Sequence, residues 1–292
     1  MSSGSHIALV VERHESVDST NDVARERLAA GAVAPLLVRA ESQRAGRGRR
    51  GRTWLDSPGT ALLLSLGVRA DARGPLSSDP ARAWRVAAEF ALAAADAIED
   101  AAGLQLGAVA LKWPNDLVLR KVEGGTTRSF QKIGGVLSEA SNLGAPDASL
   151  VVGLGINVRG DIARLDANLA ATATSLEIAT GRPVDREALF LDLVARLEGR
   201  LGALAVGRFD VAGWRSRQLL DGCEVEVDLG GEGIVTGQVM GHDGASGAMI
   251  LSVDGIERAI EMGEVARVLR IEIGRATSEL QSRLHLVCRL LL

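Results

Sequence analysis

The sequence predicts two domains, a larger one of mixed strands and helices and a smaller one made of strands. The 292 residues suffice for one large hydrophobic core and a second small one. Strand and helix patterns mingle up to residue 220, whereas short strand patterns joined by glycine turns follow. We therefore expect domains at 1–220 and 221–270, followed by a tail at 271–292 whose role is open.

The composition is that of a soluble globular protein. Hydrophobic residues make up 47% of the chain, yet no apolar run approaches the length of about 18 residues that a membrane span needs. No basic and apolar leader opens the chain, so we expect a cytoplasmic protein without a membrane partner. Two distant cysteines and four scattered histidines predict neither a disulfide framework nor a zinc site. Any metal should therefore arrive with a substrate.

Three small polar residues stand at the start of the first predicted helix. Ser19 and Asp22 have the spacing of a capping box, and Gly31 suits the left-handed position after the last turn. Ser19, Thr20 and Asn21 either only cap this helix or also supply donors and acceptors to the polar head of a ligand. Strands are expected around this helix at 7–11, 36–40 and 60–68.

A loop rich in arginine and glycine joins the second and third of these strands. Five arginines fall between Arg44 and Arg52 with no acid among them, in a chain of formal charge −4. Because like charges on one turn repel, the loop is either an anion site or a solvated basic turn. Gly46, Gly48 and Gly51 match the dinucleotide-binding fingerprint, which needs a helix to start at the third glycine. Residues 53–59 are instead loop-like, and a strand follows them.

The later helices are predicted from their first residues. Asp79 is a suitable N-cap and Pro80 a suitable first helical residue, and Asp185 has the same capping character. The alanine-rich face of the first of these helices should pack closely on a sheet. The expected helices run over 79–103, 185–204 and 211–219.

Lysine is rare in this chain, so the positions that keep it stand out. Only three of the 33 basic residues are lysines. Lys112 lies with Asn115 and Asp116 at a strand break, where a core would not favour such polar groups. Lys132 begins another strand ahead of the Gly134–Gly135 pair, and it is either an edge gatekeeper or a functional ammonium. Strands are expected at 109–113, 116–119, 131–139 and 149–157, with a polar excursion at 122–130 and a weakly structured, lid-like segment at 158–183.

From Asp221 onward the pattern changes to short strands at regular spacing. Gly, Asp-Gly and Gly-Glu-Gly turns separate them, which is typical of a small five-stranded barrel. Three interpretations of the tail are open: packing on the body, self-association into a homodimer, or an extension foreign to the natural protein. The expected strands are 223–229, 233–240, 248–253, 256–260 and 264–270.

Five motifs in sequence order resemble those of biotin protein ligases. They are Ser-Thr-Asn at 19–21, Gln43 with the glycine-arginine loop at 46–51, Lys-Trp-Pro-Asn-Asp at 112–116, Lys-x-x-Gly-Val-Leu at 132–137 and Gly-Ile-Asn at 155–157. The resemblance covers residues 8–270 and implies an α+β fold. A class II synthetase-like catalytic domain, with a mixed β-sheet and helices on one side, would precede a small SH3-like β-barrel. Since no helix-turn-helix segment precedes Ile7, we expect a monofunctional ligase that does not bind DNA.

The resemblance implies a two-step reaction. Biotin and ATP, with Mg²⁺ bridging the phosphates, form biotinyl-5'-AMP, and a lysine of a biotin carboxyl-carrier domain of an acyl-CoA carboxylase then takes the biotin. The implied catalytic residues are Arg47, Lys132 and Asp116. The implied biotin-binding residues are Ser19, Thr20, Asn21, Gln43, Gly46, Arg47, Gly48, Arg49, Trp54, Lys132, Gly134 and Gly135. The implied nucleotide-binding residues are Arg47, Arg49, Arg50, Lys112, Asn115 and Asn157, and no residue is assigned to the metal.

Two other functions compete with this one. A lipoate ligase can share the architecture, but the intact arginine loop and the predicted barrel weigh against it. A ligand sensor without catalysis is the second, and the expected absence of a DNA-binding element disfavours it.

Overall fold

The computed structural model describes residues 6–70, 79–123 and 126–270, which form two compact units. The first unit holds the residues up to 111 together with 115–119 and 131–217. Among the described residues, the second holds 112–114, 120–130 without 124 and 125, and 218–270. The predicted tail at 271–292 lies outside the described residues.

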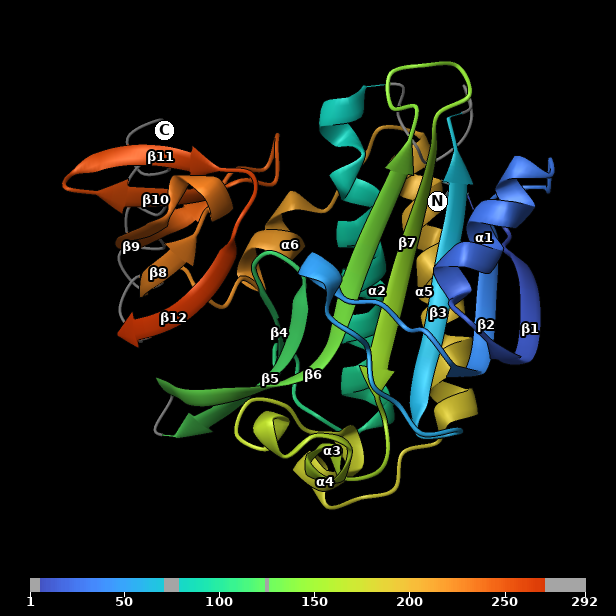
Figure 1. Cartoon of the computed structure of the whole chain (residues 1–292), viewed down its shortest axis with the longest axis horizontal. Helices are drawn as coiled ribbons and strands as arrows, with labels where there is room; N and C mark the ends of the chain where they lie inside the picture. Colours follow the sequence, from blue (N-terminus) through green and yellow to red (C-terminus); the bar gives the residue numbers. More distant parts are fainter. Residues whose placement is uncertain (1–5, 71–78, 124–125, 271–292) are drawn as a thin grey trace, which may run out of the picture. The chain divides into compact units, whose positions relative to one another are not determined.

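A seven-stranded mixed sheet is the frame on which the candidate site is built (Figure 1). Its order is β1-β2-β3-β7-β6-β5-β4. β1 runs parallel to β2, whereas the β2–β3, β3–β7 and β7–β6 pairs are antiparallel. The strands are β1 Val10–Val17, β2 Leu36–Gln43, β3 Ala61–Arg69, β4 Val109–Lys112, β5 Asp116–Glu123, β6 Thr126–Ser141 and β7 Ser149–Asn157.

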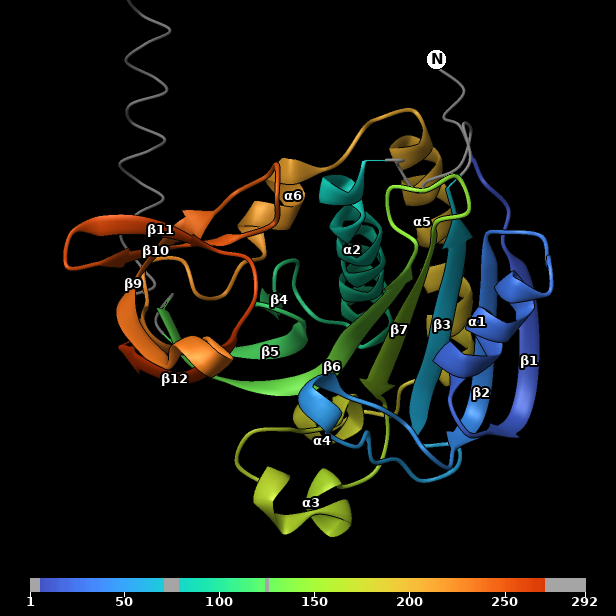
Figure 2. The same ribbon diagram turned by 45° about the horizontal axis from the view of Figure 1, so that its top comes forward.

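Helices cover both faces of this sheet, so the expectation of helices on one side was wrong. α2 (Trp84–Ala101) and α5 (Arg186–Ala205) share one core with alternate β3 residues such as Leu62 and Leu64. α1 (Thr20–Ala29) packs through Leu28 on the other face, against Leu36 and Val38 of β2. Figures 1 and 2 show α1 on the face opposite to α2 and α5. Because successive strand side chains alternate, apolar residues at both parities require cover on both faces.

The first strand lies later than predicted, at Val10–Val17 instead of 7–11. It pairs in parallel with β2, beginning with Val10 opposite Leu36, and it is an end strand of the sheet. Most of its residues are exposed or half-buried. An edge strand can carry polar residues, so its composition gave no apolar signal beyond Val11.

The long helix also begins later than predicted. Asp79 caps a short 3₁₀ turn, η2 (Pro80–Arg82), by accepting a bond of 3.0 Å from the Ala81 N–H, and α2 starts only at Trp84. By contrast, the Asp185 carboxylate accepts from the N–H groups of Glu187 and Ala188 at the start of α5. The predicted α5 is therefore confirmed together with its cap.

Two segments are more regular than predicted. The polar excursion expected at 122–130 instead extends β5 and β6, the neighbouring strands on either side of residues 124 and 125. The segment at 158–183 holds α3 (Ile162–Leu165), η3 (Ala167–Leu169) and α4 (Leu176–Thr180). A polar side chain caps each of the three, and Leu176 is fully buried. These helices are too short to produce a readable hydrophobic period.

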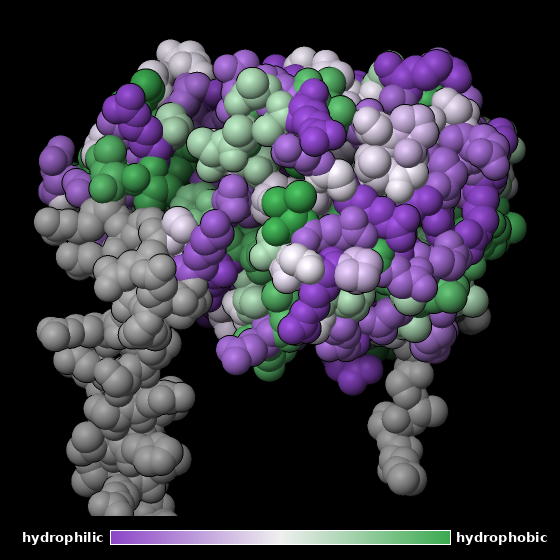
Figure 3. All heavy atoms as spheres, turned by 90° about the horizontal axis from the view of Figure 1, so that it is seen from below, coloured by the Kyte–Doolittle hydropathy of each residue, from purple (hydrophilic) through white to green (hydrophobic). Residues whose placement is uncertain are grey.

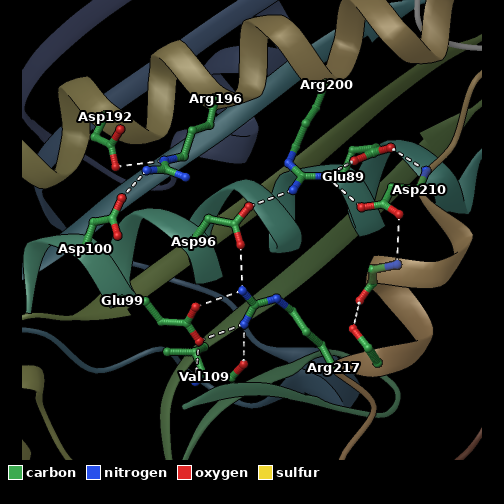
Figure 4. Close-up of polar contacts among 12 residues, drawn as sticks. Glu89, Asp96, Glu99, Asp100, Val109, Asp192, Arg196, Arg200, Asp210 and Arg217 are labelled. Atoms are coloured by element: carbon green, nitrogen blue, oxygen red, sulfur yellow. Dashed lines mark hydrogen bonds and ion pairs between the residues drawn. The ribbon is translucent and has the colours of Figure 1, made fainter. Parts of the chain in front are cut away.

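A network of ion pairs joins α2 to α5 and to the segment that follows α6 (Val211–Ser216), as Figure 4 shows. Arg217 is 6% exposed, and its guanidinium donates to both carboxylate oxygens of Glu99 at 2.8 Å and to Asp96 at 2.6 Å. Arg200 of α5 reaches Glu89 and Asp96 of α2. A buried guanidinium depends on such partners, because its charge has lost its water.

We predict that Glu99→Gln destabilises the fold by about 2–3 kcal/mol, since it leaves the buried Arg217 short of one negative partner. Asp100→Asn is the matched control, because Asp100 is 69% exposed where it pairs with Arg196. This control should cost about 0.5 kcal/mol or less. Urea unfolding of both variants measures the difference, and equal losses would contradict the assigned role of burial.

The strands of the second unit are confirmed close to their predicted positions. They form an antiparallel sheet of order β11-β10-β9-β8-β12, with Val225, Val239 and Leu251 buried. This order places β11 and β12 at the two ends, so closure into a barrel stays a prediction. The strands are β8 Glu224–Asp228, β9 Ile234–His242, β10 Met249–Val253, β11 Ile256–Ile260 and β12 Glu264–Arg270.

The surface seen in Figure 3 mixes hydrophilic residues with small hydrophobic groups. Within the described ranges, no helix combines the length and the apolar character needed to cross a bilayer.

Candidate active site

Most of the predicted site residues belong to the first unit, and several lie on the sheet face that α1 covers. On this face Ser65 of β3 stands opposite Gly153 of β7, and Gly155 of β7 stands opposite Gly135 of β6. A Cβ at Gly153 would lie 2.4 Å from Asn21 Oδ1. The glycines therefore leave the backbone bare where polar and aromatic groups lie on it.

The Trp54 ring occupies the space above Gly155, the second of these two glycines of β7. A Cβ at Gly155 would lie 2.5 Å from the indole ring, so the ring rests directly on the β7 backbone. The indole Nε1 is buried and has no hydrogen-bond partner in the structure. A buried donor of this kind is costly unless another group pairs with it.

We predict that Gly155→Ala displaces the Trp54 ring and destabilises the protein by about 1–3 kcal/mol through overpacking. Gly199→Ala is the control, because its Cβ meets nothing within 4 Å on helix α5. That change should stabilise the helix by about 0.5–1 kcal/mol. Thermal unfolding of the two variants checks the opposite signs, and a neutral Gly155→Ala would contradict this placement of Trp54.

A chain of polar contacts starts at the beginning of α1. Thr20 donates from its backbone N–H to Gln43 Oε1 at 2.8 Å, and its hydroxyl lies 3.0 Å from the same oxygen. Ser65 Oγ lies 2.7 Å from Thr20 Oγ1 and 2.6 Å from Asn21 Oδ1. Asn21 Nδ2 donates to Glu139 Oε2 at 2.9 Å. Thr20, Asn21 and Gln43, which the sequence singled out, are thus brought together, with Thr20 and Asn21 only 3% and 4% exposed.

Ser19 is the N-cap residue of α1 as expected, but its side chain makes no capping hydrogen bond. It is buried and extended, with φ −152°. The capping-box interpretation of Ser19 and Asp22 is therefore wrong, because Asp22 turns instead to arginine. Gly31 has φ +87°, which confirms the predicted left-handed position after the helix.

The arginine loop folds back on itself as a small turn. The Gly48 N–H donates to the Arg52 carbonyl at 2.7 Å, and the Trp54 N–H donates to the Gly46 carbonyl at 2.9 Å. Between them lies η1 (Arg49–Gly51), where φ is positive at Arg50 and Gly51. Figures 1 and 2 both show this blue segment lying against β6.

Arg47 ties the loop to the body of the unit. Its guanidinium donates to both carboxylate oxygens of Asp22, at 2.6 and 2.9 Å, and to Glu139 at 3.2 Å. The hydrogen bond from Arg47 holds the pKa of Asp22 below its usual value, and Arg25 adds to the effect. The same bond raises the pKa of Arg47. Arg44 pairs with Asp18 at the surface, so the loop arginines have different surroundings.

The other predicted loop residues lie around this turn. Gly46 is buried, and a Cβ there would lie 3.1 Å from Gln43 Nε2. Gly48 and Arg49 are half-buried, whereas Arg50 is exposed. Asp56 follows Trp54, and burial raises its pKa while a hydrogen bond with the Gln43 backbone opposes the rise.

Lys132 and Asp116 form a close ion pair, with Nζ 2.6 Å from Oδ1. Gly135 makes room for the lysine, since a Cβ there would lie 3.3 Å from Nζ. Gly134 is packed even more tightly, because its Cβ would lie 2.7 Å from the Gly155 carbonyl oxygen. Gly135 thus explains how the lysine can lie close to the sheet backbone, whereas Gly134 lets β6 and β7 approach each other closely.

Asparagine amides brace the segments beside this ion pair. Asn115 Nδ2 donates to the Val136 carbonyl at 2.9 Å, and Asn157 Nδ2 donates to the Thr174 carbonyl at 3.2 Å. Lys112 ends β4 half-buried and belongs to the second compact unit. These three predicted nucleotide-binding residues are located by the structure, and their contacts with a nucleotide stay a prediction.

Sequence reasoning missed Glu139 and Ser65 as members of the site. Each looks like an ordinary strand residue, and only strand register brings Ser65 of β3 and Glu139 of β6 to Asn21. The available signal was a buried serine position within the otherwise apolar run of β3. Gly153 was recognised only as one of two glycines in the apolar run of β7, and its contact with Asn21 was not predicted.

The arrangement can hold a polar head group and an anion on one sheet face. Donors and acceptors at Thr20 and Gln43 suit a neutral polar group, while Lys132 can stabilise a carboxylate or phosphate. Within the described residues, no group of three or more His, Cys, Asp or Glu side chains is placed to hold a metal ion. This combination fits activation of an acid more closely than hydride transfer.

The chain matches known ligases in sequence and structure. Residues 14–157 match the model of the Biotin/lipoate A/B protein ligase family. The bifunctional ligase/repressor BirA of Bacillus subtilis is 32% identical over 64% of this chain, but the match spans only 52% of that relative. A biotin–acetyl-CoA-carboxylase ligase of Mycobacterium tuberculosis is 30% identical over 86% of both chains.

A solved structure agrees with these relatives. It is a biotin protein ligase from Aquifex aeolicus in complex with biotin and ATP, which aligns with a TM-score of 0.69 at 25% identity over 89% of this chain and 99% of that one. The α+β fold, with a mixed sheet followed by a separate antiparallel sheet, is thus shared with that structure. The chain belongs to the biotin protein ligases of the biotin/lipoate A/B protein ligase family.

Proposed function

We propose that this protein is an ATP-dependent biotin protein ligase, which makes biotinyl-5'-AMP and transfers biotin to a lysine of a carrier domain. The observation that carries the proposal is the juxtaposition of the Lys132–Asp116 ion pair with the bare glycine at position 135. The polar chain at Thr20, Asn21 and Gln43 is built on the same unit. The polar residues suit a polar ring, and the lysine suits a carboxylate that reacts with a phosphate.

In the first step the biotin carboxylate attacks the α-phosphorus of ATP, and pyrophosphate leaves. Both reactants are anions, so the site must offset their repulsion and the charge that develops on the phosphoryl oxygens. We assign this task to Lys132 with Arg47, Arg49 and Arg50. Mg²⁺ enters as part of the nucleotide substrate, bound by phosphate oxygens.

The biotin head is assigned to the polar residues of α1 and β2, and its apolar part to Trp54. We assign Ser19, Thr20, Asn21 and Gln43 to supply donors and acceptors, and Trp54 to shield the aliphatic chain. Gly46, Gly48, Gly134 and Gly135 are also assigned to the biotin site. Lys112, Asn115 and Asn157 are assigned to the nucleotide.

In the second step the amine of a carrier lysine attacks the acyl carbon of biotinyl-5'-AMP, and AMP leaves. The attacking ammonium must first lose a proton, and Asp116 is the carboxylate that we assign to orient or accept it. Its pairing with Lys132 supports a further role in the first step, because it holds the lysine beside Gly135. The carrier that we propose is the biotin carboxyl-carrier domain of an acyl-CoA carboxylase.

We also propose a catalytic domain over 1–220 and a C-terminal domain over 221–270, in a cytoplasmic protein. The change to short antiparallel strands after residue 220 supports this division. A homodimer is an option that sedimentation at several concentrations can test, with and without biotin and ATP.

Exchange of labelled pyrophosphate into ATP tests the first step. We expect exchange that depends on biotin and is not supported by lipoate. Exchange with lipoate in place of biotin would favour the lipoate ligase that the same family contains. Absence of exchange with both acids would contradict acid activation.

A further inference from the structure

Glu139 touches two predicted biotin-site residues, although the sequence did not single it out. Its Oε2 accepts from Asn21 Nδ2 at 2.9 Å, and both carboxylate oxygens lie 3.2 Å from Arg47 Nη2. Arg25 lies 3.5 Å from the same carboxylate. An ionised carboxylate only accepts hydrogen bonds. Glu139 therefore fixes which end of the Asn21 amide faces it, namely the NH₂ group.

This orientation decides the next proton along the chain. With its NH₂ on Glu139, Asn21 turns Oδ1 toward Ser65 Oγ, 2.6 Å away. Two oxygens so close need a proton between them, and only the Ser65 hydroxyl can supply it. A hydroxyl has one proton, so Ser65 cannot also donate to Thr20, whose Oγ1 is 2.7 Å away.

The consequence reaches the head-group residues Thr20 and Gln43. Once the Ser65 proton lies on Asn21, the single Thr20 hydroxyl proton has two possible acceptors, Ser65 Oγ at 2.7 Å and Gln43 Oε1 at 3.0 Å. The shorter contact needs the proton more, so we infer that Thr20 donates to Ser65 and that the longer contact to Gln43 is left without a proton. Gln43 Oε1 keeps the Thr20 backbone N–H at 2.8 Å, which holds its amide in place. The Thr20 hydroxyl then has only lone pairs left for a ligand, and Gln43 Nε2 is a donor. This polarity matches a cyclic urea, which has N–H donors and a carbonyl acceptor.

We propose that Glu139 is a positioning residue that sets the proton order from Asn21 through Ser65 to Thr20, and so selects a head group bearing N–H donors. The inference rests on the proposed function in taking biotin as the ligand. A neutral glutamine at position 139 can donate to Asn21, so the amide can turn over. The order then reverses, with Asn21 donating to Ser65, Ser65 to Thr20 and Thr20 to Gln43.

The test is calorimetric titration of the full chain with biotin. We expect Glu139→Gln to raise the Kd for biotin about tenfold, the value of one hydrogen bond of ordinary strength. In an Asn21→Ala background, which cuts the proposed path, Glu139→Gln should change Kd less than about twofold. Full additivity of the two changes would overturn the proposal.

A second pair of variants separates this role from support of Arg47 or of the fold. Asp22→Asn removes the other carboxylate on Arg47 without touching Asn21, so its effect on biotin Kd should persist in the Asn21→Ala background. A Glu139→Gln effect that persists there equally would assign Glu139 to Arg47 and overturn the proposal. Ser65→Ala interrupts the same chain of hydrogen bonds at a different residue. In that background too, Glu139→Gln should lose most of its effect on the Kd for biotin.

The outcome also distinguishes this inference from the proposed function. Wild-type protein that binds no biotin would overturn the proposed function, and this inference with it. Wild-type protein that binds biotin, with the same Kd in Glu139→Gln, would overturn this inference alone.

Discussion

Lys132→Ala is expected to lower biotin-dependent release of pyrophosphate at least a hundredfold, or about 2.7 kcal/mol of transition-state stabilisation. The ammonium lies 2.6 Å from Asp116 and beside Gly135, so it is held close to the sheet backbone. We propose that it contacts the carboxylate of biotin and then the α-phosphate of ATP, two negatively charged groups that repel each other. No neutral side chain can offset that repulsion.

Lys121→Ala is the matched control, because Lys121 is an exposed lysine of β5 that has no assigned role. Its pyrophosphate release should equal that of the wild type. Asp116→Asn should lower the rate less than Lys132→Ala does, since it loosens the lysine without removing it. A loss of under about tenfold in Lys132→Ala, or 1.4 kcal/mol, would reduce Lys132 to an edge-strand gatekeeper.

Arg47→Ala is expected to release biotinyl-5'-AMP into solution faster than the wild type does, by about tenfold or more. In the structure Arg47 ties the arginine loop to Asp22 of α1 and Glu139 of β6 through charge-assisted hydrogen bonds. Losing these bonds frees the loop that we expect to shield the reactive mixed anhydride from water. Free adenylate is measured by chromatography after a single turnover without carrier domain.

Arg44→Ala is the control within the same loop. Its guanidinium is 63% exposed and pairs with Asp18, which is itself 66% exposed. Such a surface pair contributes little, so adenylate should stay bound as in the wild type. Equal release from the two variants would mean that loop charge in general, and not the Arg47 contacts, retains the intermediate.

The sequence predicted elements well where local signals were strong. Asp185 indicated the start of α5, because its carboxylate caps the helix. β7 was predicted at its observed bounds, because its apolar run ends at a polar residue. β1 was misplaced because an edge strand can be polar, and α3 and α4 were missed because a helix of one turn has no period. The apolar residues at both parities of β3 did indicate cover on both sheet faces, but they do not say which helices supply it.

The site followed the same rule. Thr20, Asn21, Gln43, Lys132 and Asp116 were found because motifs mark them, and the structure brings them into the two contact groups described above. Glu139 and Ser65 were missed because their importance depends on strand register, which a single sequence does not specify. The capping role predicted for Ser19 failed because Asp22 is drawn to Arg47 instead.

Mass spectrometry of a biotin carboxyl-carrier domain, incubated with this protein, biotin and ATP, tests the central claim most directly. We predict a gain of one biotinyl group on a single carrier lysine, which requires all three components and is lost in the Lys132→Ala variant. A carrier that stays unmodified, while the protein binds biotin and forms the adenylate, would contradict the ligase and identify a ligand sensor.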